Sequence, residues 1–321
     1  MISEKDGIHI QLKDKFVADS RKALGDVNIA SHAHMDHAFQ GDGNIVCSEL
    51  TKKLLETRLG RELKICEHPD VELIDSGHIL GSKAALIQQN GERILYTGDV
   101  SLQERAYMKG FNPPKADKLV IESTYGISAY RLPSQKEVEK RIQDWIQDTV
   151  KTPYLFGYSL GKAQKIQYII QQVTDRPIVA HGTVKKMNDA IEKSTNLEFT
   201  AKPYGENKDL LKNGDAIFIG PTSFAKTDAL NKLVKVSNGI KTGFSGWAAT
   251  SNYKYRGGYD KVFTLSDHCG FDDLNKLVEK VDPEKVYTHH GFDSEFASYL
   301  KRKEGINARA LKENQASLTD F

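Results

Sequence analysis

Cysteine is scarce in this chain of 321 residues, and the three that occur, Cys47, Cys66 and Cys269, are widely separated. An odd number of cysteines without a Cys-x-x-Cys pair argues against a disulfide framework and against a thiolate zinc knuckle. Long apolar runs are missing too, because none approaches the roughly 18 residues of a membrane span. The first ten residues carry charges where a signal peptide has its apolar stretch. We therefore expect a cytoplasmic protein that does not enter a membrane.

A strong net charge is also missing, because 45 lysines and arginines face 43 aspartates and glutamates, which leaves +2. This balance alone favours no polyanionic partner. The charge is unevenly distributed, however. The segment from Lys151 to Arg256 holds 16 basic and 8 acidic residues, a net +8, so the remaining residues carry −6. One block of the sequence is basic and the rest is acidic.

Short apolar runs recur along the chain, and each is followed at once by small, glycine or ionisable residues. This pattern predicts buried strands that end in functional loops. Apolar residues at helical spacing lie between the runs, for example Val138, Ile142, Ile146 and Val150. Alternating strands and helices predict an α/β layered fold. The predicted strands include 27–30, 94–96, 119–121, 262–265 and 286–288, and the segment 154–244 repeats strand and helix on its own, as an inserted α/β domain would.

The strongest chemical signal is the segment 31–37, SHAHMDH, which directly follows the predicted strand 27–30. Its three imidazoles and one carboxylate offer the nitrogen and oxygen ligands that zinc-like cations prefer. A lone histidine is more often a packing residue, but packing does not account for this density. The segment therefore predicts a metal-binding loop.

Further candidate ligands follow other predicted strands or lie between glycines. His78 lies between two glycines, Asp99 follows Gly98 after the strand 94–96, and His290 follows the strand 286–288. Each is a weak signal alone, because an aspartate after glycine is most often a turn residue. Together with the segment 31–37, they would supply enough ligands for two cations.

On these motifs the chain resembles the metallo-β-lactamase superfamily, and more narrowly its β-CASP nucleases. The resemblance implies an αββα sandwich at residues 1–150 and 245–321, interrupted by a β-CASP α/β domain at residues 151–244. It also implies two divalent metal ions, with zinc expected first and manganese as the alternative. Asp19 matches the early acidic motif of the family and would orient ligands without binding metal. The matching positions place His32, His34 and His78 on one ion, Asp36, His37 and His290 on the other, and Asp99 between them.

Three matches separate the β-CASP nucleases from hydrolases of small esters. Glu122 fits the acidic motif A, His268 fits motif B and His290 fits motif C. The resemblance implies that a hydroxide activated by two metals attacks the phosphorus of a phosphodiester. His268 would protonate the leaving oxygen, and Glu122 would keep that imidazole charged. The expected catalytic residues are therefore Asp36, Asp99, Glu122 and His268.

Plainer interpretations of these residues stay open. Glu122 could cap a turn, and His268 could be a strand-end histidine held by hydrogen bonds. Asp267 could support the site without binding metal, or it could cap the helix expected near Phe271. The segment 157–163 does not have the spacing of a Walker loop, which excludes a nucleotide triphosphatase.

The basic insert fits a polyanionic substrate. Aromatic and basic residues alternate near Trp247, Lys254 and Arg256, a pattern that holds single-stranded nucleic acid by stacking and charge neutralisation. Packing between domains would explain the same residues as well. The expected nucleic-acid contacts are Ser159, Lys162, Ser245, Trp247, Lys254 and Arg256.

The segments 122–126, 157–164, 245–247 and 265–268 resemble the short ligase-associated DNA exonucleases most. The first expectation is therefore a DNA exonuclease that acts on single strands or ends in DNA repair, with a DNA ligase or helicase as partner. One alternative is an RNA-processing endo- or exoribonuclease, because a histidine at motif C is usual in messenger-RNA 3′-end processing factors and ribonuclease J. A metallo-hydrolase of small esters or thioesters is the remote alternative. The sequence leaves the oligomeric state open.

Overall fold

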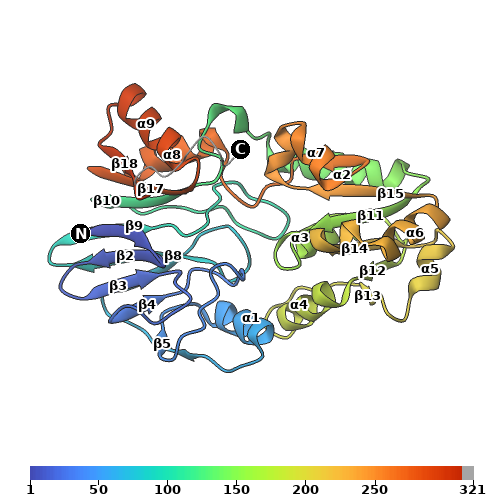
Figure 1. The fold of residues 1–321 in the computed structure, drawn as a ribbon, viewed down its shortest axis with the longest axis horizontal. Helices are drawn as coiled ribbons and strands as arrows, with labels where there is room; N and C mark the ends of the chain where they lie inside the picture. The colour runs from blue at the N-terminus through green and yellow to red at the C-terminus, as the bar shows by residue number, and fades with distance from the viewer. Residues whose placement is uncertain (313–321) are drawn as a thin grey trace. The chain divides into compact units, whose positions relative to one another are not determined.

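The computed structural model describes residues 1–312, and its chain forms two compact units (Figure 1). The first unit consists of residues 1–102, 110–131 and the chain from His268 onward, and the second consists of residues 103–109 and 132–267. The second unit is thus longer than the insert expected at 151–244. Helix α2 (Gln135–Asp148) packs on α3 (Lys162–Ile170), and β16 (Lys261–Phe263) pairs with β15 (Gly239–Phe244). Tertiary packing, which a local pattern does not reveal, sets these boundaries.

The first unit contains two main sheets. In the four-stranded sheet, β1–β2 and β2–β3 pair antiparallel, whereas β3 and β4 pair parallel. In the six-stranded sheet, β9, β10, β17 and β18 are parallel, and β8 pairs antiparallel with both β7 and β9. The strands in spatial order are β1 (Ile2–Lys5), β2 (Gly7–Gln11), β3 (Lys15–Ala18) and β4 (Val27–Ile29), then β18 (Ala308–Ala310), β17 (Lys285–Gly291), β10 (Lys118–Ser123), β9 (Glu92–Tyr96), β8 (Lys83–Gln89) and β7 (Val71–Asp75), with β5 (Asn44–Ile45) and β6 (Lys64–Ile65) as a separate pair.

The six-stranded sheet is buried on both faces, as β8 illustrates. Ala85 and Ile87 pack in the core against the four-stranded sheet, whereas Ala84 and Leu86 pack in the core under the helices. This division follows from the alternation of side chains along a strand. Helices α8 (Phe271–Val281) and α9 (Asp293–Lys303) cover the outer face, and α1 (Glu49–Leu59) and the short η1 (Ser128–Tyr130) complete the helices of this unit among the described residues.

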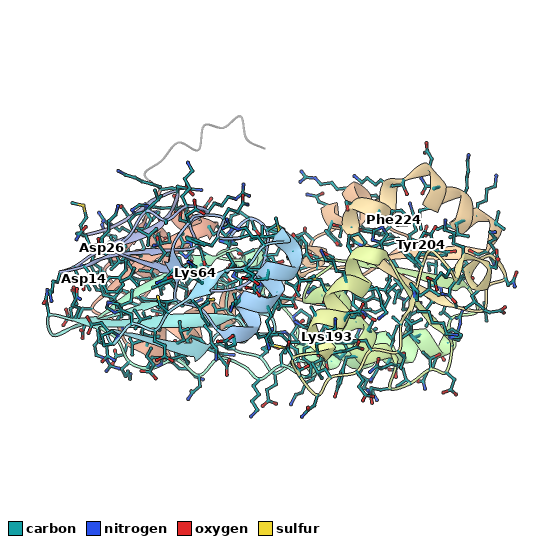
Figure 2. All side chains as sticks on the ribbon, turned by 90° about the horizontal axis from the view of Figure 1, so that it is seen from below. Asp14, Asp26, Lys64, Lys193, Tyr204 and Phe224 are labelled. Atoms are coloured by element: carbon teal, nitrogen blue, oxygen red, sulfur yellow. The ribbon has the colours of Figure 1, made fainter. Side chains whose placement is uncertain are left out.

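The second unit is built on a parallel six-stranded sheet. Its strands are buried on both faces, which is why Ile217, Phe218 and Ile219 follow one another without a polar residue. The rings of Tyr204 and Phe224, 5.8 Å apart, pack in its core (Figure 2). The strand order is β13 (Lys202–Pro203), β12 (Ile178–Ala180), β14 (Ile217–Pro221), β11 (Thr152–Gly157), β15 and β16, and the remaining helices are α4 (Gly182–Glu192), α5 (Lys208–Lys212), η2 (Thr222–Lys226), α6 (Asp228–Val236), η3 (Gly246–Ala249) and α7 (Asn252–Gly257).

The expected α/β fold class is confirmed, and the predicted strands occur at or within a few residues of their expected positions. The expected helix differs at its end, because α2 stops at Asp148 and Val150 is 95% exposed. Thr149 already has extended backbone, which turns the chain toward β11. None of the helices in residues 1–312 combines the length and hydrophobicity that a membrane span requires.

Candidate metal centre

Parallel strands bring the candidate residues to one edge of the six-stranded sheet. Asp99 follows β9, Glu122 lies near the end of β10, and His290 lies near the end of β17. These three strands are parallel neighbours, so their carboxyl ends meet at the same edge. The strand order of the sheet thus brings together Asp99, Glu122 and His290, which lie far apart in the sequence.

The first group of donor atoms is buried and consists of His32, His34, His78 and Asp99. Its ligand atoms all lie within 4.8 Å of one another. The Nε2 atoms of His32 and His78 are each 3.4 Å from Oδ2 of Asp99, and both histidines are fully buried. Nε2 of His32 is buried without a hydrogen-bond partner. A buried nitrogen without a partner is costly, and a cation at this point would satisfy it. This donor set therefore fits a divalent metal.

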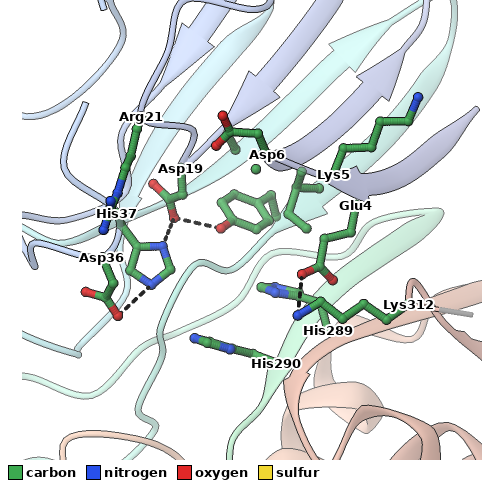
Figure 3. Close-up of a pocket in the computed structure, with 14 residues that line it drawn as sticks. Glu4, Lys5, Asp6, Asp19, Arg21, Asp36, His37, His289, His290 and Lys312 are labelled. Atoms are coloured by element: carbon green, nitrogen blue, oxygen red, sulfur yellow. Dashed lines mark hydrogen bonds and ion pairs between the residues drawn. The ribbon is translucent and has the colours of Figure 1, made fainter. Parts of the chain in front are cut away.

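The second group of donor atoms consists of the exposed Asp36 and His290 and the partly buried His37. Nε2 of His37 lies 3.5 Å from Oδ2 of Asp36, and the rings of His37 and His290 are 5.8 Å apart. All three line a cavity of about 180 Å³ (Figure 3). The structure thus brings together every residue that the sequence predicted for the second ion, on the accessible side of the site.

A buried carboxylate holds the first donor group in place. Asp19 accepts hydrogen bonds from the Ser31 amide at 2.7 Å, the Ser31 hydroxyl at 2.5 Å and the Tyr96 hydroxyl at 2.7 Å. The Ser31 hydroxyl also lies 2.8 Å from Nδ1 of His32, which leaves Nε2 of that ring for a metal. Sequence alone did not single out Ser31 or Tyr96. Ser31 begins the histidine motif, but Tyr96 carried no local signal.

The backbone around the site is strained at defined positions. Asp19 and His290 have positive φ values of 52° and 64°, which non-glycine residues rarely adopt. Gly98, just before Asp99, has a φ of 52°, and a Cβ atom there would lie 2.7 Å from Cβ of Ser31. Such strain persists only where surrounding contacts enforce it, and it clusters at functional sites.

Glu122 and His268 form a separate pair beside the first donor group. Nδ1 of His268 lies 2.9 Å from Oε1 of the fully buried Glu122, and the rings of His268 and His78 are 4.6 Å apart. The Thr124 amide donates to Oε2 of Glu122 at 2.9 Å. Burial opposes ionisation of Glu122, but His268 and the bond from Thr124 outweigh it and hold the pKa at about 2. Glu122 is therefore a charged carboxylate aimed at an imidazole, as motifs A and B suggested.

Buried ion pairs occupy two of the side chains that the sequence singled out, Lys162 and Asp267. Lys162 is 3% exposed and its ammonium lies 2.9 Å from Asp267, so it does not present its charge to a nucleic acid. Asp267 does not cap α8, because that helix begins after Gly270. Lysines of α3 in the second unit hold it instead.

The other expected nucleic-acid contacts lie at or near the surface of the second unit. Lys254 and Arg256 are exposed on α7, with Tyr255 between them at 79% exposure. Ser159, Ser245 and Trp247 are partly buried. Tyr259, by contrast, is buried and stacks on Phe156 at 6.1 Å, so packing explains it.

Comparison with known proteins adds an independent finding. Residues 260–311 match a family model described as "Zn-dependent metallo-hydrolase RNA specificity domain". The chain is 32% identical over 309 residues to a "Probable DNA ligase" of Opitutus terrae, which covers 91% of this chain and 29% of that protein. It is 25% identical over 346 residues to the "Probable RNase MJ4" of Methanocaldococcus jannaschii, which covers 81% of this chain and 80% of that protein.

A solved structure supports the fold. The "Protein of Unknown Function from Enterococcus faecalis V583" matches with a TM-score of 0.59 and 16% identity, over 90% of this chain and 80% of that one. The layered fold, the two donor groups and the family model matched by residues 260–311 together support a metallo-hydrolase that uses a divalent metal. The matched family model and these relatives support the resemblance to the metallo-β-lactamase superfamily and its β-CASP nucleases.

Proposed function

We propose that this protein hydrolyses phosphodiester bonds of nucleic acid with two divalent metal ions. The observation that carries the proposal is the convergence of two donor groups and the Glu122–His268 pair at one sheet edge. Bound cations would lower the pKa of water and neutralise phosphoryl oxygens. One ion would be held by His32, His34 and His78 and the other by Asp36, His37 and His290, with Asp99 between them.

The chain's own residues supply the remaining chemistry. His268 donates a proton to the leaving oxygen, a task for which an imidazole is suited near neutral pH. Glu122 orients the ring through Nδ1, and its low pKa keeps it an acceptor throughout the working range. Asp19 orients His32 through Ser31. An enzyme for small esters would need neither a proton donor of this kind nor a basic second unit, which favours the nuclease.

Zinc is the metal we propose first. Five of the seven expected ligands are imidazoles, which suit zinc, while the carboxylates of Asp36 and Asp99 are compatible with manganese. Metal content of the purified protein and reactivation of stripped protein by each ion would decide between them.

The proposed substrate is DNA, as single strands or ends. The 32% identity to the probable DNA ligase of Opitutus terrae over 91% of this chain favours DNA, and a DNA ligase is accordingly the proposed partner. RNA is the second candidate, because the family model over residues 260–311 is described as an RNA specificity domain and His290 occupies motif C. Lys254 and Arg256 on α7 are the proposed contacts to the phosphate backbone.

One experiment separates these substrates. The purified protein is incubated with end-labelled single-stranded DNA and RNA of the same sequence, with zinc, with manganese and with a chelator. Stepwise loss of DNA from one end, only with metal, supports the DNA exonuclease. Cleavage confined to RNA moves the assignment to the ribonuclease. If neither polymer is cleaved while a thioester is hydrolysed, the nuclease proposal is wrong.

A further inference from the structure

The second unit buries a cluster of like charges around the carboxylate of Asp267, and the partly buried Glu139 is a further carboxylate close to Lys165 and Arg105. Asp267 is 4% exposed, and Lys162, Lys165 and Arg105 around it are 3%, 0% and 1% exposed. The ammonium of Lys162 lies 2.9 Å from Oδ2 of Asp267, while Lys165 pairs with Oδ1. Arg105 acts electrostatically on Asp267 and on both lysines. Three buried cations thus face one buried anion.

A buried cluster of this kind is not an effective way to stabilise a fold. Removing charges from water is energetically costly, and apolar residues of similar size often stabilise a core equally well or better. The cost is visible here, because burial, together with the neighbouring Arg105, lowers the pKa of Lys165 to about 7. Buried ion pairs do hold their partners in a defined geometry, however. The ion pairs of this cluster hold one short segment of the chain.

That segment is Leu265–Asp267, and each of its residues is held by the second unit. The ammonium of Lys162 donates to the carbonyl of Leu265 as well as to Asp267. The Ser266 amide donates to Oε1 of Gln135 at 2.7 Å. Lys162 and Lys165 lie on α3, and Gln135 begins α2. Three successive residues of a loop are thus fixed to two helices.

The next residue in the chain is His268, which belongs to the first unit. Its Nδ1 lies 2.9 Å from Glu122, and the amide of the following Cys269 donates to the carbonyl of Val100 at 2.8 Å. The backbone is therefore held on both sides of the peptide bond between Asp267 and His268. His268, the proton donor of the proposed reaction, directly follows the buried cluster.

We propose that Lys162 and Lys165, through Asp267, are positioning residues for His268. The cluster fixes the three residues that lead into His268, and it therefore restricts the backbone from which the imidazole of that residue projects. An error of about 1 Å in such a position can cost a hundredfold in rate. This inference rests on the proposed function, because it takes His268 as the proton donor.

The test compares two substrates whose leaving groups differ in whether they must be protonated. An oligonucleotide releases an alkoxide, which requires protonation, whereas bis(p-nitrophenyl) phosphate releases a stable phenolate, which does not. The main variant is Lys162→Met, which removes the ammonium but keeps most of the length of the side chain, and it leaves Asp267 paired with Lys165. Lys165→Met is the second variant and retains the bond from Lys162 to Leu265. Melting temperature and metal content are measured for each.

We expect Lys162→Met to lose about 10- to 100-fold in kcat on the oligonucleotide, part of the contribution of a general acid. Its kcat on bis(p-nitrophenyl) phosphate should stay within about threefold of wild type. Lys165→Met should show the same selective loss. His268→Ala provides the reference pattern. Lys185→Met, which removes a partly exposed lysine paired with Asp189 on α4 of the same unit, should match wild type on both substrates.

The outcomes are distinguishable. Equal losses on both substrates in the folded lysine variants would show that the cluster is only structural, and undiminished oligonucleotide cleavage would also overturn the inference. If the wild-type protein cleaves neither substrate, the proposed function itself fails. If Lys162→Met does not fold, Lys165→Met decides by the same comparison.

Discussion

At the scale of the residue, two aspartates near the metal centre differ in what they can bind, because one is buried and the other is exposed. Asp19 and Asp36 lie 17 positions apart in the sequence and on either side of His37 in Figure 3. Asp19 is buried and accepts three short hydrogen bonds, so its oxygens are occupied by the protein. The side chain of Asp36 is 67% exposed and can bind an ion. Hydrogen bonding therefore suits Asp19 to a supporting role and leaves the oxygens of Asp36 available to a metal ion.

Replacing Asp19 by alanine should weaken metal binding without removing a ligand. Loss of an outer partner of a metal-binding histidine typically costs about 10- to 100-fold in affinity. Competition with a chromophoric chelator measures this change. The matched control is Asp26→Ala in the bend just before β4, where the carboxylate accepts a hydrogen bond from the Lys15 amide and lies outside the site. Equal affinity in Asp19→Ala and Asp26→Ala would contradict the role given to Asp19.

Replacing His268 by alanine should lower kcat on an oligonucleotide by about 100-fold or more, because a proton donor is lost. Metal content should not change, since the two donor groups are intact. Single-turnover cleavage and elemental analysis of the same preparation test both statements. His9→Ala in β2 is the control. Wild-type cleavage by His268→Ala with full metal content would exclude the proton-donor role.

At the scale of the element, local patterns predicted most of what the structure contains. Apolar runs indicate strands because a strand that is buried on both faces of a parallel sheet needs apolar residues on both sides. The metal-binding loop could be predicted because its candidate ligands are close together in the sequence. The Lys165–Asp267 pair could not be predicted this way. The two residues are 102 positions apart, and Lys162 and Lys165 resemble ordinary helix-surface lysines until α3 is packed against its neighbours.

The buried position of Lys165 predicts a pH dependence of stability. Its pKa falls from 10.5 in the unfolded chain to about 7 in the folded one, so the unfolded chain binds more protons between these values. Stability from this residue therefore rises with pH across that window. Wild type should gain stability relative to Lys165→Met between pH 7 and about 9, measured by urea denaturation. Arg105, Lys162 and Asp267 are present in both proteins, and parallel profiles would contradict the prediction.

At the scale of the whole molecule, the near-neutral charge separates by unit. The second unit carries 22 basic and 15 acidic residues, a net +7, and the first unit and its terminus carry −5. The sign difference predicted for residues 151–256 therefore survives when the observed units replace the expected boundaries. Carboxylates in the first unit suit cations, and the basic second unit suits a polyanion.

Charge on the second unit predicts a salt-dependent affinity for single-stranded nucleic acid. Each phosphate contact contributes about 0.7 to the slope of log K against log salt, so Lys254→Gln with Arg256→Gln should reduce the slope by about 1.4. Fluorescence anisotropy at several salt concentrations measures it. The control changes Lys301 and Arg302 to glutamine on α9, where both side chains are also exposed. An unchanged slope in the α7 variant would remove these residues from the proposed interface.

The most direct test of the account is cleavage of one oligonucleotide by stripped protein, by the same protein reloaded with zinc or manganese, and by Asp36→Ala under the same loading. Asp36 is an exposed member of the second donor group, so its replacement removes a ligand while the core packing is retained. If the proposed metal site cleaves nucleic acid, the stripped protein does not cleave the oligonucleotide and the reloaded protein recovers cleavage. Asp36→Ala does not recover cleavage after the same loading. Cleavage by Asp36→Ala at the wild-type rate, or cleavage that persists without metal, would contradict the proposal.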